Sequence, residues 1–191
     1  ARQVAGGVGT VGDGLADVER VLVTHYDLDH VGSLGRLDAL DAPVYVGRAD
    51  ADYVARRDRP PWFSRKGAFQ RSVGWWVRPP NGRVEPVDDG DEIGGFRAVH
   101  APGHTPGHTV YVHDDRSVAL LGDVVRESSG HLEPSPWFLS DDVREVKDSV
   151  RDLADRLGEF DVAAMGHGTP FGKRGSEHLA NCAEEIRVPS A

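Results

Sequence analysis

Residues 24–30 read Thr-His-Tyr-Asp-Leu-Asp-His and place two histidines and two aspartates within seven positions. They follow residues 20–24, a short apolar and β-branched run that is typical of a buried strand. Alternate side chains of an extended chain point to the same side, so His25 and Asp27 should face one way. A helix that begins near Asp29 would turn Asp29 and His30 toward a second position. The segment therefore predicts two neighbouring sets of metal ligands.

Three later motifs carry the same chemistry. Each follows a predicted strand, and the ends of strands at one edge of a sheet can converge on one site. Imidazole nitrogens and carboxylate oxygens suit zinc, manganese and iron. The pattern is typical of a two-metal site, in which ions about 3.5–4 Å apart present a hydroxide as a nucleophile. The motifs are Pro102-Gly103-His104-Thr105-Pro106-Gly107-His108, Leu121-Gly122-Asp123 and Gly166-His167-Gly168.

The remaining histidines have simpler explanations. We expect His113, His131 and His178 to lie on the surface or in local hydrogen bonds, and His100 to be an ordinary strand residue. His108 fits a supporting or structural role better than that of a ligand.

The rest of the pattern predicts strands that alternate with helices and with antiparallel hairpins. One helix should place Leu34, Leu37 and Leu40 on a single face. A longer helix should be capped by Ser140 and should end at Gly158. The helix with the three leucines covers residues 33–40, and a further helix covers residues 48–57. The predicted strands cover residues 20–24, 43–46, 84–87, 96–100, 109–113, 117–121 and 160–165.

The composition favours small-molecule chemistry. The chain has 191 residues, which suits a single domain over residues 1–191. A net charge of −9 argues against a nucleic-acid surface, which needs a basic patch. No apolar run approaches the roughly 20 residues that span a bilayer, and the single cysteine, Cys182, fits a reducing compartment. We therefore expect a cytoplasmic protein with a small-molecule substrate and no nucleic-acid or membrane partner.

Residues 59–80 stand apart from this pattern because prolines bracket a set of tryptophans and phenylalanines. One interpretation is a loop that packs its aromatic side chains on the body of the domain. The other is a substrate lid or a subunit contact, since exposed aromatic clusters often mark an interface.

The four motifs together, from about Val21 to Gly168, resemble those of the metallo-β-lactamase superfamily, and of hydroxyacylglutathione hydrolases within it. The resemblance implies an α/β fold, an αββα sandwich with two divalent metal ions at one edge, zinc first and iron or manganese as alternatives. It implies that the metal-bound hydroxide attacks a carbonyl and that Asp29 also acts in catalysis by orienting it. The implied ligands are His25, Asp27 and His104 for one metal, Asp29, His30 and His167 for the other, and Asp123 as the bridge, with Thr24, Thr105 and His108 supporting them from behind.

Two departures from the family pattern change what is expected. Asp27 stands where the family usually has a histidine, so three carboxylates would face two ions and favour manganese or iron. If the carboxylate of Asp27 does not reach the first metal, that metal keeps only His25, His104 and Asp123 as ligands. The family also begins with strands that residues 1–20 cannot supply. An N-terminally incomplete sheet would expose an edge that another subunit, as in a homodimer, would cover.

Three functions are consistent with these residues. The first is a dinuclear metal-dependent hydrolase that uses a metal-bound hydroxide to cleave an ester, thioester, lactone or related bond. The second is a mononuclear non-haem iron dioxygenase of the persulfide dioxygenase type, which would use His25, His104 and Asp123. The third is a degenerate, non-catalytic member of the family that binds metal.

Overall fold

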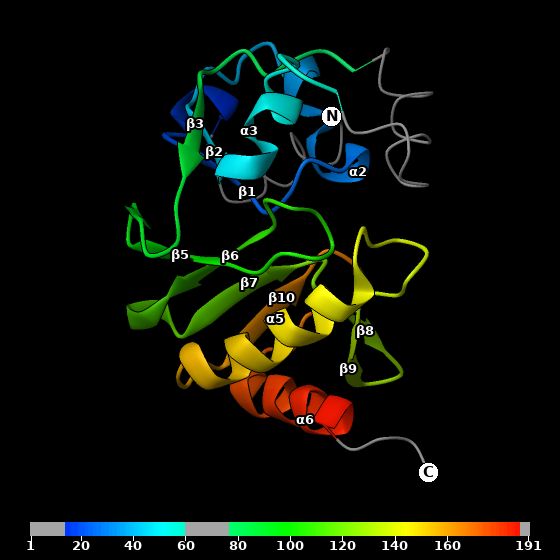
Figure 1. The fold of residues 1–191 in the computed structure, drawn as a ribbon. Helices are drawn as coiled ribbons and strands as arrows, with labels where there is room; N and C mark the ends of the chain where they lie inside the picture. The colour runs from blue at the N-terminus through cyan, green and yellow to red at the C-terminus, as the bar shows by residue number, and fades with distance from the viewer. Residues whose placement is uncertain (1–13, 60–76, 188–191) are drawn as a thin grey trace.

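The structure is a computed structural model that describes residues 14–59 and 77–187 of the chain. Two β-sheets lie face to face, with helices on the outer side of each (Figure 1). The helices α2 (Leu28–Val31) and α3 (Arg48–Val54) lie on the side of the first sheet. The helices α5 (Val143–Arg156) and α6 (Gly175–Arg187) cover the second. The predicted αββα sandwich is the observed architecture.

The first sheet holds three parallel strands in the order β1-β2-β3. Short β-branched runs form them because such side chains pack well on a pleated, half-buried surface. The buried valines of β1 and β2 share one core cluster with residues of α2 and α3. The predicted strands are confirmed within one or two residues, and the predicted helix 48–57 is confirmed but ends three residues early. The strands are β1 (Val21–Val23), β2 (Val44–Gly47) and β3 (Val84–Val87).

The second sheet holds five strands in the order β10-β7-β6-β5-β4. Only β10 and β7 run parallel; the other neighbours are antiparallel. The strands predicted over residues 96–100 and 109–113 are confirmed at both ends, and those over 117–121 and 160–165 within two residues. The strands are β4 (Glu92–Ile93), β5 (Phe96–His100), β6 (Thr109–His113), β7 (Val118–Gly122) and β10 (Val162–Met165).

Tyr111 ties the two sheets together. Its ring is fully buried among apolar residues of both sheets. Its hydroxyl oxygen lies 3.1 Å from the carbonyl oxygen of Val23 and 3.2 Å from that of Tyr45, on strands of the opposite sheet. A buried tyrosine needs such a partner for its polar end. The contact fixes the edge from which the loops after β1 and β7 project.

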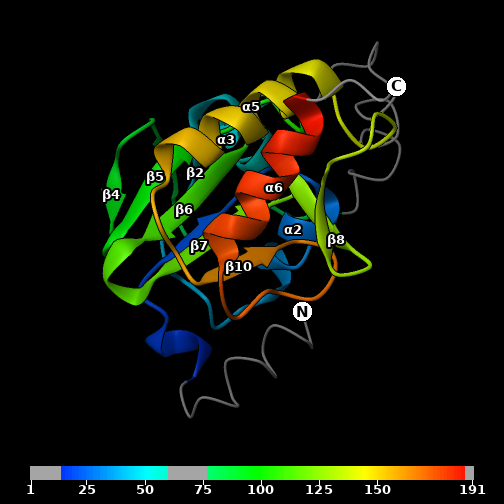
Figure 2. The same ribbon diagram turned by 90° about the horizontal axis from the view of Figure 1, so that it is seen from below.

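The helix α5 packs its apolar stripe on the second sheet. Val146, Val150 and Leu153 recur at helical spacing and are fully buried. Full burial of such a side chain contributes roughly 1.5–3 kcal/mol. Seen from below, α5 and α6 lie side by side across the strands (Figure 2), and α6 packs against the strand β9 (His131–Pro134). The hairpin of β8 (Val125–Ser128) and β9 (His131–Pro134) forms a separate two-stranded sheet.

The predicted helix over residues 33–40 is wrong. The helix α2 comes earlier, at Leu28–Val31, and residues 34–36 form only a single 3-10 turn. Gly35 packs its backbone against the carbonyls of Arg78 and Pro79, where no side chain fits, and glycine also disfavours a longer helix. The three leucines of the predicted face are nevertheless buried.

The predicted cap at Ser140 is also wrong. The side chain of Asp142 caps α5 by accepting from the backbone N–H groups of Arg144 and Glu145. The backbone N–H of Asp142 donates to the carbonyl of Gly103. This bond holds the residues before α5 against the 101–108 loop, so the helix begins at Val143. Its end before Gly158, which has a φ of +73°, is confirmed.

The sequence pattern predicted neither the hairpin β8–β9 nor the helix α6. Most of the aromatic segment 59–80 and of residues 1–20 lies outside the described residues. Within the described part of the chain, no helix combines the length and the apolar character that crossing a membrane requires.

Candidate metal centre

Four loops bring the predicted ligands to one edge of the sandwich. They follow β1, β5, β7 and β10, the strands whose ends meet there. Seven side chains from these loops form two adjoining groups, and within each group the ligand atoms lie within 4.8 Å of one another. We call them the inner group, His25, Asp27 and His104, and the outer group, Asp29, His30, Asp123 and His167.

The inner group is buried. His25 is 0 %, His104 2 % and Asp27 8 % exposed. The Oδ2 atom of Asp27 lies 3.0 Å from Nε2 of His104 and 3.5 Å from Nε2 of His25. Asp27, the residue that departs from the family pattern, therefore lies inside the group and reaches both imidazoles.

The two buried imidazoles present the same nitrogen to the group. Nδ1 of His25 lies 2.9 Å from the hydroxyl of Thr24, and Nδ1 of His104 lies 3.0 Å from that of Ser135. These bonds orient each ring with Nε2 inward, as metal-binding histidines usually require. Nε2 of His25 is buried without a hydrogen-bond partner. Burial lowers the pKa of His25 to about 4, which keeps the imidazole neutral at pH 7.

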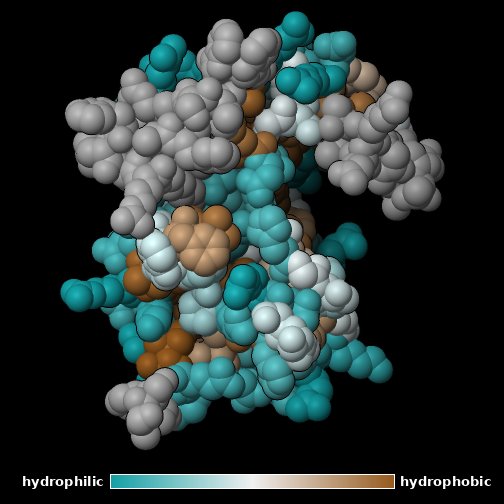
Figure 3. Space-filling view, turned by 90° about the vertical axis from the view of Figure 1, so that its right-hand side faces the viewer, coloured by the Kyte–Doolittle hydropathy of each residue, from teal (hydrophilic) through white to brown (hydrophobic). Residues whose placement is uncertain are grey.

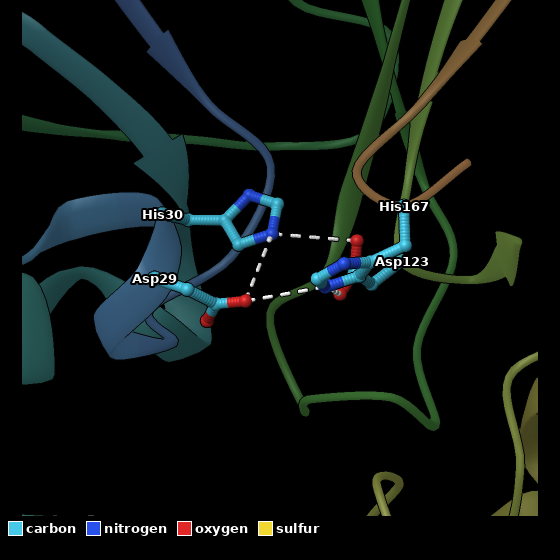
Figure 4. Close-up of side chains that lie close together, drawn as sticks. All are labelled: Asp29, His30, Asp123 and His167. Atoms are coloured by element: carbon cyan, nitrogen blue, oxygen red, sulfur yellow. Dashed lines mark ion pairs between the residues drawn. The ribbon is translucent and has the colours of Figure 1, made fainter. Parts of the chain in front are cut away.

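The outer group joins side chains from two sides of the site (Figure 4). Asp29 and His30 come from α2, and Asp123 and His167 come from the loops after β7 and β10. Nε2 of His167 lies 3.2 Å from both Oδ2 of Asp29 and Oδ2 of Asp123. The side chains of Asp29 and His167 are 57 % and 55 % exposed, so this end of the site faces solvent.

Charge in the outer group favours a protonated His30. Burial alone lowers the pKa of His30, but its bond to Asp123 and the charges of Asp123 and Asp29 raise it above the ordinary value. Burial alone raises the pKa of Asp123, but His30 and the charges of His25 and His104 hold it below its ordinary value. A cation at this position would replace the proton in balancing these carboxylates.

Asp123 connects the two groups. Its Oδ1 atom lies 3.3 Å from Nε2 of His30, while Oδ2 lies 3.9 Å from Nε2 of His25 and 3.8 Å from Nε2 of His104. Its backbone N–H donates to Nε2 of His108 at 3.0 Å. Nε2 of His108, the nitrogen with which a histidine ligand would bind a metal, therefore accepts a hydrogen bond from the backbone of Asp123.

Two glycines make this close packing feasible. Gly122 has a φ of +58°, and a Cβ atom there would lie 2.7 Å from Nε2 of His108. A Cβ atom on Gly166 would overlap the carboxylate of Asp123 and approach the ring of His30 to 2.7 Å. Only glycine gives the backbone this approach.

Asp50 and Ser135 are functional candidates that sequence reasoning missed. Asp50 is fully buried in α3 and accepts from the hydroxyl of Thr105 at 2.6 Å. Thr105, predicted to support the ligands, therefore bonds to Asp50. The signal for Asp50 was a charged residue at helical spacing with the buried Ala51 and Val54. Ser135 carried no comparable signal.

A pocket of about 250 Å³ opens beside the outer group. Asp123 and His167 form its inner wall, and Val125, Pro136 and Leu139 give it an apolar side. Leu139, Trp137 and Phe138 are exposed on the loop between β9 and α5. Figure 3 shows the right-hand side of the molecule, where small hydrophobic patches lie among hydrophilic side chains. The remaining lining residues are Arg126 and Ser135.

The histidines that were predicted to lie on the surface, in local hydrogen bonds or within a strand are outside both groups. Nε2 of His100 lies 2.9 Å from the carbonyl oxygen of Pro106. His178 stacks on Phe171 with ring centroids 3.8 Å apart, and His113 packs against Phe96. The hairpin residue His131 is exposed.

A comparison with known families supplies the wider context. The model of the Metallo-beta-lactamase superfamily matches residues 5–167. The chain belongs to this superfamily. Among curated members it is 26 % identical over 197 residues to "Probable metallo-hydrolase YflN" of Bacillus subtilis, a match that covers 88 % of this chain and 72 % of that protein. It is 27 % identical to "Hydroxyacylglutathione hydrolase GloC" of Haemophilus influenzae, over 78 % of this chain and 68 % of that one.

A solved structure of the superfamily is also similar. It is a di-iron-bound form of TTHA1623, with a TM-score of 0.66 and 26 % identity, over 92 % of this chain and 80 % of that chain. Membership in the superfamily, with metallo-hydrolases among the relatives, indicates a metal-dependent hydrolase that binds divalent metal ions.

Proposed function

We propose that this superfamily member is a dinuclear metallo-hydrolase, in which the inner and outer groups each hold one divalent ion and Asp123 lies between them. The observation that carries the proposal is the convergence of seven ligand side chains in two adjoining groups. Zinc is the first candidate metal, with iron and manganese as alternatives. A relative crystallised in a di-iron form supports keeping iron among them.

The donor atoms of the inner group fit a metal ion. Nε2 of His25 is buried and lacks a hydrogen-bond partner, which costs roughly 1–3 kcal/mol if nothing else satisfies it. The Nδ1 atoms of His25 and His104 already have hydroxyl partners. The nitrogens that remain face the carboxylate of Asp27. This arrangement offers a divalent cation two imidazole nitrogens and an anionic oxygen, which are ligand types that zinc accepts.

Asp27 would make the centre more anionic than the usual family site. With Asp29 and Asp123 it brings three carboxylates to the two groups. Harder, negatively charged oxygen ligands favour manganese or iron more than an imidazole does. We therefore expect this centre to tolerate manganese and iron better than a site with histidine at position 27.

Two divalent ions at such a site would supply Lewis-acid polarisation of the scissile carbonyl and a water of lowered pKa. The residues of the chain contribute positioning and proton transfer. The Oδ atoms of Asp29 face solvent beside His167, where they can orient the attacking water and accept its proton. The pocket beside Asp123 and His167 would hold the acyl part of a small ester, thioester or lactone against Val125, Pro136 and Leu139.

A screen of metal-loaded protein tests this proposal. Purified protein is loaded separately with zinc, manganese or iron and assayed against aryl esters, acyl thioesters and lactones. We expect hydrolysis of at least one class, its loss with a chelator, and its recovery when metal is restored. Protein that holds two metal ions per chain and hydrolyses none of these compounds would contradict the proposal.

A dioxygenase is the second candidate function, because His25 and His104 both lie within 4 Å of Asp123. Two histidines and one carboxylate form the set that mononuclear non-haem iron oxygenases use. Oxygen uptake by iron-loaded protein with glutathione persulfide, lost in His25→Ala but kept in His167→Ala, would favour this function over hydrolysis. Metal content well below one ion per chain would favour a non-catalytic member of the family.

A further inference from the structure

Asp50 lies at the point where two ligand-bearing loops meet. It belongs to α3, outside both ligand groups, and its side chain is fully buried. One loop carries His25 and Asp27, and the other carries His104. The relative position of these loops determines whether the three side chains of the inner group can hold one ion.

The carboxylate of Asp50 bonds to both loops. Its Oδ2 atom accepts from the backbone N–H of Tyr26, the residue between His25 and Asp27, at 3.1 Å. The same oxygen accepts from the hydroxyl of Thr105, the residue after His104, at 2.6 Å. Its Oδ1 atom accepts from the backbone N–H of Gly107 at 2.8 Å. One rigid group therefore fixes three points that flank the inner ligands.

The loop that carries His104 approaches Asp50 closely. A Cβ atom on Gly107 would lie 2.7 Å from Oδ1 of Asp50 and would collide with its backbone nitrogen. Only glycine lets the backbone of the loop reach the carboxylate at this distance. The backbone N–H of Thr109 also donates to the carbonyl of Thr24 at 2.8 Å, so the two segments have a second link farther along.

Holding the two loops together with a buried carboxylate has a free-energy cost. Taking a charge out of water costs several kcal/mol unless partners compensate. In the described part of the chain the compensation comes from these three donors, and no lysine or arginine forms an ion pair with Asp50. Even with these donors, burial raises the pKa of Asp50 to about 7. Three directed hydrogen bonds, and not an ion pair, therefore hold the side chain here, and they fix the placement of the two loops.

We propose that Asp50 is a positioning residue for the inner group, which sets the relative placement of His25, Asp27 and His104 and so controls metal affinity there. It contacts neither the metal nor the substrate. The inference rests on the proposed function only in that the inner group must bind a divalent ion. Residues that orient metal ligands from behind typically change metal affinity by about 10- to 100-fold when replaced.

The test compares Asp50→Asn with Asp52→Asn in protein that also carries His167→Ala. The His167→Ala change removes a ligand of the outer group, so a titration reports on the inner group. Asp52 is the matched control because it lies on the same helix but is exposed and paired with Arg57. Zinc affinity is measured by competition with a coloured chelator, and cobalt is used to record the visible spectrum of the bound ion.

We expect Asp50→Asn to weaken zinc binding by about 10- to 100-fold and to change the intensity of the cobalt bands. Asp52→Asn should bind zinc within about twofold of its parent, with the same cobalt spectrum. Folded Asp50→Asn protein with the affinity and spectrum of its parent would overturn the inference, even if its melting temperature fell. If the parent itself binds neither zinc, manganese nor iron, the proposed function fails and not the role of Asp50.

Thr105→Val gives a second variant if Asp50→Asn does not fold. It removes one of the three donors to Asp50 and keeps the two backbone bonds. We expect a smaller loss of zinc affinity, about three- to tenfold, with a changed cobalt spectrum. Unchanged affinity and an unchanged spectrum in folded Thr105→Val would overturn the inference.

Discussion

The inner and outer groups have the same ligand chemistry but opposite surroundings. His25 and His104 in the inner group are almost fully buried, with fixed hydroxyl partners on Nδ1. In the outer group, Asp29 and His167 are more than half exposed. Burial keeps His25 neutral and hydroxyl partners orient both inner imidazoles, whereas exposure lets water and substrate reach the outer group. The difference suggests that the inner group mainly retains its ion and the outer group mainly serves the reaction.

Replacement of Asp123 should have the largest effect on activity because its carboxylate lies between the inner and the outer group. Asp123→Asn removes the carboxylate that approaches the imidazoles of both groups. We expect kcat/KM for hydrolysis to fall on the order of 10³-fold, as when a main electrostatic contributor to a reaction is lost. The measurement is steady-state kinetics with the substrate found in the screen.

Asp115→Asn is the control for this change. Asp115 is exposed on the turn between β6 and β7 and belongs to neither group. Its activity should stay within about twofold of the unchanged protein. An Asp123→Asn variant with comparable activity would mean that the two groups do not work as one centre.

Replacing Asp27 or Asp29 distinguishes the roles of the inner and the outer group. Asp27 is buried in the inner group and Asp29 is exposed in the outer one. Asp27→Asn should weaken metal retention by about 10- to 100-fold, because a buried ligand position is lost. Asp29→Asn should mainly lower kcat, because its carboxylate faces solvent where the reaction would occur. Metal titration and kinetics on both variants check this. Equal effects of the two changes on metal affinity would contradict the assignment.

Lowering the pH should release the metal ions of the two groups in two separate steps. Metal binds the unprotonated imidazole, so affinity falls about tenfold per pH unit below the pKa of the ligand. Burial lowers the pKa of His25 to about 4, so protons displace the inner ion only near that pH. Burial alone lowers the pKa of His30, but Asp123 and Asp29 raise it above its ordinary value, so protons compete for the outer group at a higher pH than for the inner group.

Metal content after dialysis at a series of pH values from 8 to 4 measures this order. The outer ion should leave first as the pH falls, and the inner ion last. His131→Gln, which changes an exposed histidine outside both groups, should leave both steps in place. Release of both ions in a single step, or of the inner ion first, would argue against the contrast between the groups.

The smallest effect concerns the pocket beside the outer group. Leu139→Ala removes apolar surface from its wall, which should raise KM by about three- to tenfold and leave kcat nearly unchanged, since the lost contact is made equally before and during reaction. Phe138→Ala is the control, because Phe138 is exposed nearby but does not line the pocket. If the two variants gave the same KM, the substrate would not use this wall.

The sequence predicted the candidate centre better than the elements around it. Residues 24–30 and the Gly-flanked His104, Asp123 and His167 follow strand ends, so local pattern alone placed them at one edge. The role of Asp50 depends on contacts with residues far away in the chain, such as Thr105. No local pattern contains such contacts, although the position of Asp50 on the buried face of a helix was a usable signal.

The missed elements have identifiable causes. The hairpin β8–β9 is rich in charged residues, but its turn at Ser129-Gly130 has positive φ at both residues, which is typical of a two-residue hairpin. In α6, Cys182 and Ala183 fill part of the buried face. These small side chains weaken the apolar periodicity on which a sequence-based prediction depends.

Metal content per chain in three proteins tests the central claim most directly. The unchanged protein, His25→Ala and His167→Ala are purified without chelator, supplied with zinc and analysed for bound metal. We expect about two ions in the unchanged protein and about one in each variant, with the ion of His167→Ala held more tightly than that of His25→Ala. One ion in the unchanged protein, or two in His25→Ala, would contradict it.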